Sequence, residues 1–309
     1  MILEVKDIHK SFGEKEVLHG INFQVESGKA LGLLGRNGAG KTTTIRILMD
    51  VFHANSGELL LDGKRFIPGK HRIGYLPEER GLYPKRTVMD QMIFLGTLRG
   101  MSSREARQSA ERWLKRLEVD EYAPRKLETL SKGNQQKVQL ASTLVHNPEI
   151  VILDEPFSGL DPVNSQILKE VINELIAEDR LVIFSSHQMS YVEEFCDHIA
   201  IIDKGEVTLA GELKEIKREY GRNRLVLAAE DTSPAELRER AEQVLNGVAM
   251  VSGEKKEFLI LELVEGKNRR QVLERLAGSD ISVGRFGSYE PSLNDIFVEK
   301  VGEENEKDL

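Results

Sequence analysis

Short apolar stretches alternate with turn residues through the first 30 positions, a pattern typical of strands. The apolar stretches Leu3/Val5/Ile8, Val17/Leu18 and Ile21/Phe23/Val25 predict antiparallel strands. Further along, the hydrophobic spacing predicts a buried strand at residues 30–34, a helix at 42–52, and strands at 58–61 and 73–76. This part of the chain is therefore predicted to hold an antiparallel β subdomain and the start of an α/β core.

Helical spacing dominates from about residue 87 to residue 146. The sequence Ser102-Ser103-Arg104-Glu105 predicts a helix start with a capping box. Strands and helices then alternate, with strands at 150–153, 181–185 and 199–202 and helices at 162–177 and 189–196. Such alternation predicts a mostly parallel sheet covered by helices, from which the segment 87–146 stands off as a helical insertion.

A second unit is predicted after Gly221. Its strands are expected at residues 224–229, 249–251, 258–263 and 281–288, and its helices at 234–246 and 269–277. The order β-α-β-β-α-β is that of a ferredoxin-like α+β domain. A last helix at 293–301 precedes a charged tail. We therefore expect domains at residues 1–220 and 222–302, followed by a tail at 303–309.

The composition narrows the class of protein. The 309 residues carry a net charge of −8, with acidic and basic side chains mixed along the chain, which argues against binding nucleic acid through a broad basic surface. Cys196 is the only cysteine, so a reducing cytosol is the expected compartment. No apolar run approaches the roughly 18–20 residues that cross a bilayer, and the N-terminal sequence predicts a strand rather than a signal peptide. Any membrane role is therefore expected to come through a partner.

A glycine-rich loop follows the strand at residues 30–34. Gly35-Arg36-Asn37-Gly38-Ala39-Gly40-Lys41-Thr42 matches the pattern G-x-x-x-x-G-K-[ST], in the strand–loop–helix context that the pattern requires. Its glycines let successive backbone N–H groups turn toward phosphate oxygens, and the helix N-terminus adds a positive dipole end. We expect Lys41 to neutralise the β- and γ-phosphates of a nucleotide and Thr42 to bind magnesium.

Two adjacent carboxylates end the strand at residues 150–153. We expect Asp154 to hold the magnesium ion, as in a Walker B element, and Glu155 to polarise an attacking water as general base. Adjacent acids after a strand are also common as helix caps, so the pair takes its meaning from the phosphate loop. His187 follows the strand at 181–185 and is expected to bridge Glu155 and the γ-phosphate, orienting rather than deprotonating.

A second glycine-bearing loop, Leu130-Ser131-Lys132-Gly133-Asn134-Gln135-Gln136, precedes a helix. A serine hydroxyl, a glycine N–H and a helix N-terminus together offer an anion-binding edge. By itself, Ser-x-Gly before a helix is an ordinary N-cap. Beside the phosphate loop, it predicts the second half of a nucleotide site that needs a neighbouring copy for completion.

These loops together resemble those of the ATP-binding subunit of an ABC transporter, over about residues 1–220. In that family the signature loop of one subunit closes over the ATP held by the phosphate loop of another. Phe12 matches the aromatic residue that stacks on adenine, Ser158-Gly159-Leu160-Asp161 resembles the D-loop at the dimer interface, and His187 matches the switch histidine.

The resemblance implies a set of site residues and two cofactors, ATP and Mg²⁺. Its catalytic residues are Glu155 and His187, and its magnesium ligands are Thr42, Asp154 and Glu78. The residues expected to bind ATP are Phe12, Gly35, Asn37, Gly38, Ala39, Gly40, Lys41, Thr42, Thr43, Ser131, Gly133, Asn134 and Asp161.

Several positions depart from the family pattern. Lys132 and Asn134 replace a glycine and the glutamine of the usual signature, while its serine and second glycine are kept. Glu78 stands where the family has a glutamine that senses magnesium and water, and its carboxylate adds negative charge near the γ-phosphate. Phe12 replaces the more usual tyrosine and retains the stacking surface.

The C-terminal unit adds a second resemblance. The sequence from Pro291 to Val301 resembles the ending of ATPases paired with ABC-2-type export permeases, including sodium- and drug-efflux systems. We therefore expect an ATP-hydrolysing subunit that forms a homodimer or heterodimer around two MgATP and powers a separate membrane permease. It would be attached to the cytoplasmic face of the membrane through that permease. The C-terminal unit would be either a stabilising appendage or a regulator.

Alternatives remain at the level of sequence. A soluble ABC-type ATPase acting on ribosomes or DNA is one, although such proteins carry two cassettes, long coiled coils or zinc-binding cysteines, and this chain has none of these. A P-loop kinase would have no use for the Ser131 loop. The loop residues Leu82 and Tyr83, with Met89, are expected either to contact a partner helix or to form the core of the insertion.

Overall fold

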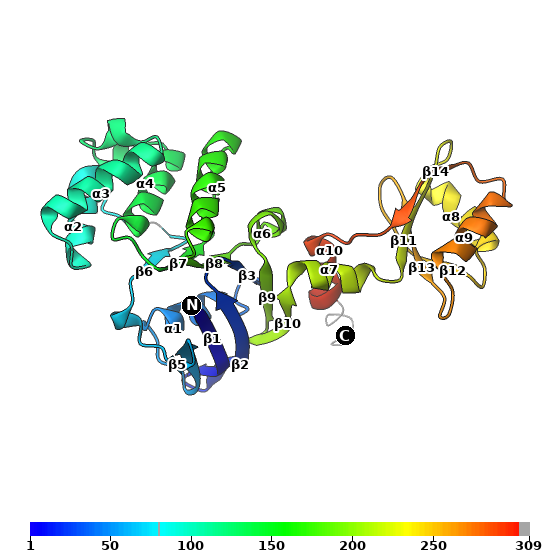
Figure 1. Ribbon diagram of the computed structural model, residues 1–309, viewed down its shortest axis with the longest axis horizontal. Coiled ribbons are helices and arrows are strands. Elements are labelled where there is room, and N and C mark those ends of the chain that lie inside the picture. The colour runs from blue at the N-terminus through cyan, green and yellow to red at the C-terminus, as the bar shows by residue number, and fades with distance from the viewer. Residues whose placement is uncertain (80, 303–309) are drawn as a thin grey trace. The chain divides into compact units, whose positions relative to one another are not determined.

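Two β-sheets and a helix share one apolar core in the computed structural model, which describes residues 1–79 and 81–302 (Figure 1). The predicted tail at 303–309 and Arg80 of the predicted 78–83 loop lie outside the described residues. The chain divides into two compact units after Leu213. The predicted domain boundary at residues 220–222 remains a prediction.

The N-terminal sheet is antiparallel, as predicted. Its four strands run in the order β2-β1-β4-β5, with the bounds β1 Ile2–Phe12, β2 Lys15–Glu26, β4 Ser56–Leu61 and β5 Lys64–Arg65. Along β2 the buried positions are Leu18, Ile21, Phe23 and Val25. Ile21, Phe23 and Val25 share one side because side chains of a strand alternate, and an irregularity at Gly20 lets Leu18 join them in the core.

The central sheet has six strands in the order β10-β9-β3-β8-β7-β6. Their bounds are β3 Ala30–Leu34, β6 Ile73–Leu76, β7 Ile150–Asp154, β8 Leu181–Ser185, β9 His198–Asp203 and β10 Glu206–Glu212. All neighbours are parallel except β9 and β10. Every residue of β3, β7 and β8 is buried, as expected for strands covered on both faces.

Helices cover this sheet and form the predicted insertion. Their bounds are α1 Lys41–Leu48, α2 Val88–Leu98, α3 Ser103–Arg116, α4 Lys132–Leu144, α5 Pro162–Ala177 and α6 Met189–Phe195. The predicted capping box at the start of α3 is confirmed: the Ser102 N–H donates to Glu105 Oε2 at 2.9 Å, and the Glu105 N–H donates to Ser102 Oγ at 3.2 Å.

Several elements differ from the sequence prediction: strand β5 and helix α7 (Leu213–Gly221) were not predicted, and α1 and β10 differ for reasons that the structure shows. Helix α1 ends at Leu48 rather than at residue 52, because Asp50 adopts a left-handed backbone with φ 58° and the N–H of Val51 donates to Arg46 O at 2.9 Å, which closes the helix as a Schellman motif. Strand β10 was not predicted, because most of its residues are only partly buried and its hydrophobic signal is weak.

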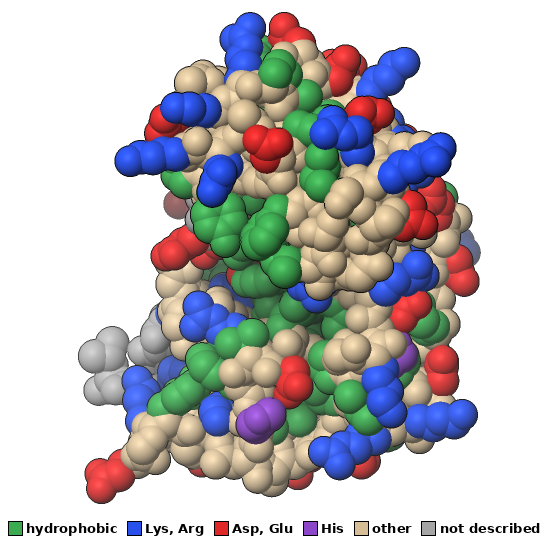
Figure 2. Space-filling model, turned by 90° about the vertical axis from the view of Figure 1, so that its left-hand side faces the viewer, with side chains coloured by type: hydrophobic (Ala, Val, Ile, Leu, Met, Phe, Trp, Pro, Cys, Tyr) green, Lys and Arg blue, Asp and Glu red, His purple; other side chains and the backbone are tan. Residues whose placement is uncertain are grey.

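One face of this unit, which carries α2 and β6, is partly hydrophobic. Figure 2 shows hydrophobic side chains gathered beside a hollow on this face. Large apolar side chains exposed nearby in sequence include Tyr83, Phe94 and Leu98, with exposed fractions of 53%, 46% and 65%. A cavity of about 470 Å³ is lined by Ile73, Tyr75, Leu82, Leu95, Leu98, Gln139 and His146, among others. Met89 is half-buried.

The second unit has the predicted β-α-β-β-α-β order, preceded by α7 (Leu213–Gly221) and followed by α10 (Leu293–Gly302). Its elements are β11 Arg224–Ala229, α8 Pro234–Val244, β12 Ala249–Glu254, β13 Leu259–Leu263, α9 Arg269–Ala277 and β14 Val283–Ser288. The antiparallel sheet order β12-β13-β11-β14 is that of the ferredoxin-like fold. Residues of α8 and α9 share a core with one face of this sheet.

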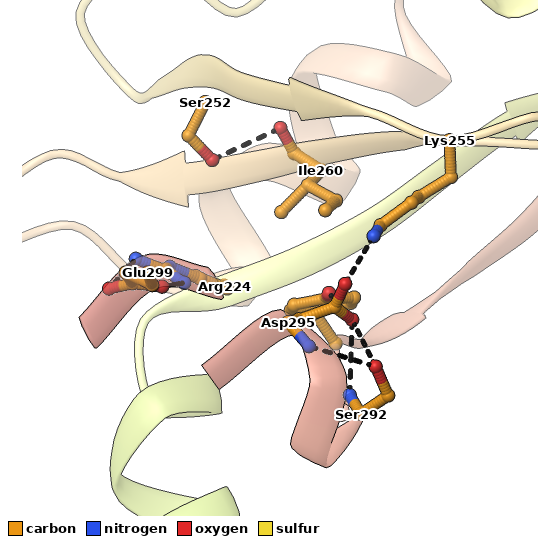
Figure 3. A network of polar contacts seen from close by, with 8 residues as sticks. Arg224, Ser252, Lys255, Ile260, Ser292, Asp295 and Glu299 are labelled. Carbon is orange, nitrogen blue, oxygen red and sulfur yellow. Dashed lines mark hydrogen bonds and ion pairs between the residues drawn. The ribbon is translucent and has the colours of Figure 1, made fainter. Parts of the chain in front are cut away.

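A polar network fastens α10 to the sheet of this unit (Figure 3). Asp295 forms an ion pair with Lys255 and accepts hydrogen bonds from the Tyr289 hydroxyl at 2.8 Å and the Ser292 hydroxyl at 2.8 Å. Further along α10, Glu299 pairs with Arg224 of β11 at 2.9 Å. Burial alone would raise the pKa of Asp295, but the hydrogen bonds from Lys255, Ser292 and Tyr289 outweigh burial and lower that pKa to about 2.

Replacing Asp295 by asparagine should therefore destabilise the second unit. Because the folded-state pKa lies below the unfolded value, the carboxylate contributes stability above pH 4, and this contribution is lost as the pH falls toward 2. At pH 7 we expect Asp295→Asn to reduce the free energy of local unfolding by about 2 kcal/mol. Amide hydrogen exchange of β11 and β13 in the full chain measures this unit by itself.

Asp231→Asn, at an exposed position of the same unit, is the matched control because it makes the same change of charge. Equal exchange rates in the two variants would show that the Asp295 network adds no stability.

Candidate functional site

The loop Gly35–Thr42 joins β3 to α1 as the sequence predicts. Gly35, Gly38 and Gly40 have φ angles of 153°, 81° and 118°, values that side chains disfavour. A Cβ on Gly35 would lie 2.2 Å from the carbonyl oxygen of Ile202. The loop therefore requires glycine for backbone conformation and for close packing against β9. Asn37 and Gly38 are exposed at its tip, and Ala39 is buried.

Lys41 lies over its own loop. Its Nζ donates to Gly35 O at 2.7 Å and to Arg36 O at 3.2 Å. Burial lowers the pKa of Lys41, and the carboxylates of Glu155, Asp154 and Glu78 oppose that effect. Glu78 follows β6, and Asp154 and Glu155 end β7, so acids from two strand ends favour the charged form of one ammonium group.

The threonines that follow Lys41 have different surroundings. Thr42 is exposed and Thr43 half-buried on the first turn of α1. Thr44 is buried, and its hydroxyl donates to Gly40 O at 3.0 Å. Thr42 is thus the hydroxyl of this turn that is open to a ligand beside Lys41.

Asp154 and Glu155 end β7 and are only 4% and 7% exposed. Asp154 Oδ1 accepts a short hydrogen bond from the Ser185 hydroxyl, and its Oδ2 lies 3.4 Å from the Tyr75 hydroxyl. Burial and the nearby Asp154 charge raise the pKa of Tyr75 to about 12, so the phenol stays protonated. The Asp154 carboxylate is therefore fixed from both neighbouring strands, β8 and β6.

Glu155 is held by the residues that follow β8. Its Oε1 accepts the His187 backbone N–H at 2.7 Å and lies 2.9 Å from His187 Nδ1. Its Oε2 accepts the Ser186 hydroxyl at 3.2 Å. Glu155 also has a left-handed backbone, with φ 49°, an uncommon conformation for a residue with a side chain. These contacts fix the carboxylate, while the His187 side chain stays 65% exposed.

Ser131, Gly133 and Asp161 belong to a second cluster. Ser131 is the N-cap of α4, where its Oγ accepts the Asn134 N–H at 3.3 Å. A Cβ on Gly133 would lie 2.9 Å from Asn164 Nδ2, and that amide donates to Asp161 Oδ2 at 2.6 Å. Asp161 in turn caps α5. The signature loop and the D-loop are thus adjacent within one chain.

Phe12 lies at the end of β1 and is 45% exposed. Its ring packs edge-on against Phe52, with ring centroids 5.1 Å apart, and Lys10 Nζ lies 5.1 Å from its ring centroid. An exposed ring beside a cation can stack on a further flat group. The predicted adenine platform is available at this position.

Glu78 lies on the exposed loop after β6. Gln139 of α4, which is only 5% exposed, donates its amide to Pro77 O and to Glu79 O, each at 3.2 Å. Sequence reasoning missed Gln139, Tyr75, Ser185 and Ser186. The two serines had a usable signal, because they precede His187 at the end of a strand, and the ends of parallel strands meet at one edge of a sheet.

The donor set fits a magnesium ion. A threonine hydroxyl and carboxylate oxygens are the hard ligands that Mg²⁺ prefers, usually with several waters and substrate phosphates. Thr42 and Asp154 would hold such an ion, and it would screen phosphate charge. The site as a whole combines a phosphate loop with its lysine, ligands for a magnesium ion and a fixed carboxylate. These are the groups that nucleotide hydrolysis requires.

Comparison with known proteins agrees with this geometry. The chain matches the family described as "ABC transporter" over residues 18–158 and the family described as "ATP-binding protein DrrA1-3-like, C-terminal domain" over residues 211–301. It is 40% identical to the uncharacterised ABC transporter ATP-binding protein YhaQ of Bacillus subtilis (strain 168), over 97% of this chain and 99% of that protein. The chain belongs to the ABC transporter ATP-binding proteins.

Other members of this family extend the comparison. The linearmycin resistance ATP-binding protein LnrL of Bacillus subtilis (strain 168) is 34% identical over 73% of this chain and 74% of its own length. The Nod factor export ATP-binding protein I of Burkholderia lata is 32% identical over 68% of this chain and 70% of its own length. This ABC ATP-binding protein therefore has the fold predicted for it and is an ATPase.

Solved structures of ABC cassettes superpose on the chain. The "Structure of ATP binding subunit of ABC transporter" has a TM-score of 0.66 and 30% identity, over 72% of this chain and 94% of that one. The "Dimeric Structure of MJ0796, a Bacterial ABC Transporter Cassette" has a TM-score of 0.62 and 25% identity, over 68% of this chain and 98% of that one.

The buried His146 of the ATP-binding protein should make its first unit sensitive to acid. Burial, together with Arg99, lowers the pKa of His146 to about 4, although a hydrogen bond to Ile73 O opposes the shift. Between pH 6.5 and 4 the unfolded chain binds a proton that the folded chain does not, so stability falls as the pH falls. We expect His146→Gln to remove about 2 kcal/mol of the stability difference between pH 7 and pH 5.

Urea unfolding followed by fluorescence of Trp113, the only tryptophan of the chain, measures this difference. His53→Gln is the control, because the His53 side chain is 88% exposed. The assignment to His146 is wrong if both variants keep the pH dependence of the parent chain.

Proposed function

We propose that two copies of this chain, or this chain and a close relative, enclose two MgATP and hydrolyse them to drive a separate membrane permease. The proposal of ATP hydrolysis rests on the environment of Glu155. Its carboxylate is only 7% exposed and is held beside the phosphate loop by hydrogen bonds from Ser186 and His187. A general base acts best when its orientation is fixed before the reaction.

Lys41 and the loop N–H groups would bind the β- and γ-phosphates, and Thr42, Asp154 and Glu78 would bind magnesium. Glu155 would accept a proton from the attacking water as its oxygen bonds to the γ-phosphorus, while the bond from that phosphorus to the bridging oxygen breaks and ADP leaves. In its imidazolium form, His187 would donate from Nδ1 to Glu155 and from Nε2 to a phosphate oxygen. Phe12 would stack on the adenine.

The shared nature of the site is supported by the second cluster. Ser131 and Lys132 are exposed at the N-terminus of α4, where a hydroxyl, backbone N–H groups and the helix dipole can meet an anion. The related cassette MJ0796 has been solved as a dimer. We infer that Ser131, Gly133 and Asn134 of one copy contact the ATP held by the other, with Asp161 at the interface.

A permease partner is supported by the hydrophobic face described above. No helix within residues 1–79 and 81–302 is long and apolar enough to cross a membrane. The cavity beside Leu82 and Leu98, with the exposed rings of Tyr83 and Phe94, suits a short amphipathic helix. This surface would hold the protein at the cytoplasmic face of the membrane. Because relatives include a Nod factor export protein and a linearmycin resistance protein, we propose that the permease is an exporter.

Glu155→Gln should trap a dimer when MgATP is present. The amide keeps the size of the side chain but cannot accept the proton, so hydrolysis should fall by about 10²-fold or more while ATP binding persists. Size-exclusion chromatography of the full chain with and without MgATP would show the dimer. Adding Ser131→Arg to the same chain should abolish the dimer without loss of ATP binding, whereas monomers in every sample would contradict the shared site.

Leu98→Glu should weaken the association with the permease. The side chain is 65% exposed, so the charge would cost the free subunit little and would oppose an apolar partner surface. We expect at least tenfold less co-purification with the membrane partner at unchanged ATP binding. Met250→Glu, at a 60% exposed position of the second unit, is the matched control, and equal recovery of the partner by both variants would place docking elsewhere.

A further inference from the structure

One face of α4 covers the free edge of the central sheet. Within residues 1–79 and 81–302, strand β6 is the last strand of its sheet and pairs only with β7. Along a parallel strand, carbonyl groups point alternately to the two sides, so those of Ile73 and Tyr75 face the open edge. Such carbonyls need hydrogen-bond donors when they are buried.

Side chains of α4 and the residue pair after it supply these donors in register. His146 Nε2 lies 3.1 Å from Ile73 O, and Thr143 Oγ1 donates to Tyr75 O at 3.3 Å. Gln139 continues the series with Pro77 O and Glu79 O. The spacing works because one helical turn rises about 5.4 Å and two strand residues span about 6.6 Å.

Gln139 is therefore hydrogen-bonded to the backbone on both sides of Glu78. Its single amide nitrogen donates to the carbonyl before and to the carbonyl after that residue, each at 3.2 Å. The negative charge of Glu78 raises the pKa of Lys41 and so partly offsets the effect of burial. At the N-terminus of the same helix, two turns before Gln139, Ser131 and Gly133 form the edge proposed to meet the ATP of a second copy.

We propose that Gln139 is a positioning residue that ties the Glu78 loop to the signature helix, so that the two half-sites of one chain move together. The inference rests on the proposed function, in which Glu78 acts at the ATP bound by its own chain and Ser131 contacts the ATP bound by the second copy. A shift of α4 along its axis or a turn about it would pull the peptide groups around Glu78. Contact of the signature end with a second copy thereby sets the position of Glu78 in its own site.

The experiment is a double-mutant cycle between Gln139→Met and Glu78→Ala in the purified full chain. Methionine keeps the length and helix preference of glutamine and removes both N–H donors. Because Gln139 is only 5% exposed and has little surface for a ligand, we expect ATP affinity to stay within about twofold, while kcat falls about tenfold from misplacement of the loop. In the Glu78→Ala chain, Gln139→Met should have less than a twofold further effect on kcat, measured with the same assay at saturating MgATP.

Ser142→Ala is the matched control. Its hydroxyl is buried on the same helix but donates to Val138 O within that helix, at 2.8 Å, so kcat should be unchanged. Trp113 fluorescence confirms that each variant is folded, and Gln139→Glu, an acceptor-only side chain of equal size, replaces the methionine variant if that one does not fold.

Equal loss of kcat from Gln139→Met with and without Glu78 overturns the proposal, and so does an unchanged kcat. Failure of the proposed function would be seen separately. In that case the parent chain would show no MgATP hydrolysis that Lys41→Ala removes, whatever the outcome at Gln139.

Discussion

Carboxylates that leave water must meet hydrogen-bond donors, and this constraint shapes the centre of the nucleotide-binding unit. Asp154 and Glu155 are almost fully buried, which would be costly for unpartnered charges. Their donors are Ser185, Ser186 and His187 at the end of the adjacent strand β8. The order β3-β8-β7 therefore does more than build a sheet. It brings hydroxyl and N–H groups, and the ammonium of Lys41, to the carboxyl end of β7, where the two acids are buried.

A similar constraint attaches the helical insertion. The outer edge of β6 has carbonyl groups without a strand partner. Side chains of α4 and of the residues after it bond to these carbonyls in place of a further strand. A helix fixed in this way keeps its register with the strand but remains free of the strict geometry of a sheet ladder. This attachment suits an element that is proposed to carry force between a partner protein and a nucleotide, because a few side-chain bonds define its position.

Much of this structure could be predicted from local sequence patterns. The phosphate loop, the capping box before α3 and the order of elements in the second unit follow from residue spacing alone. Strand β10 was missed because its hydrophobic signal is weak, although Lys204 and Gly205, both with positive φ, mark the hairpin turn before it. Gln139 was missed for a different reason: its contacts are with residues about 60 positions earlier. No local pattern reports such a pairing, and a buried amide on a helix was the only hint.

The left-handed backbone of Glu155 has a consequence for the history of such sequences. A residue with a side chain is disfavoured at φ 49°, and glycine or asparagine would relieve that strain. The glutamate is thus kept against the conformational preference of its own position. In a lineage where hydrolysis is no longer selected for, backbone stability favours replacement of this glutamate by glycine or asparagine. A copy with glycine or asparagine there, and an intact phosphate loop, would mark a subunit that has kept nucleotide binding and given up turnover.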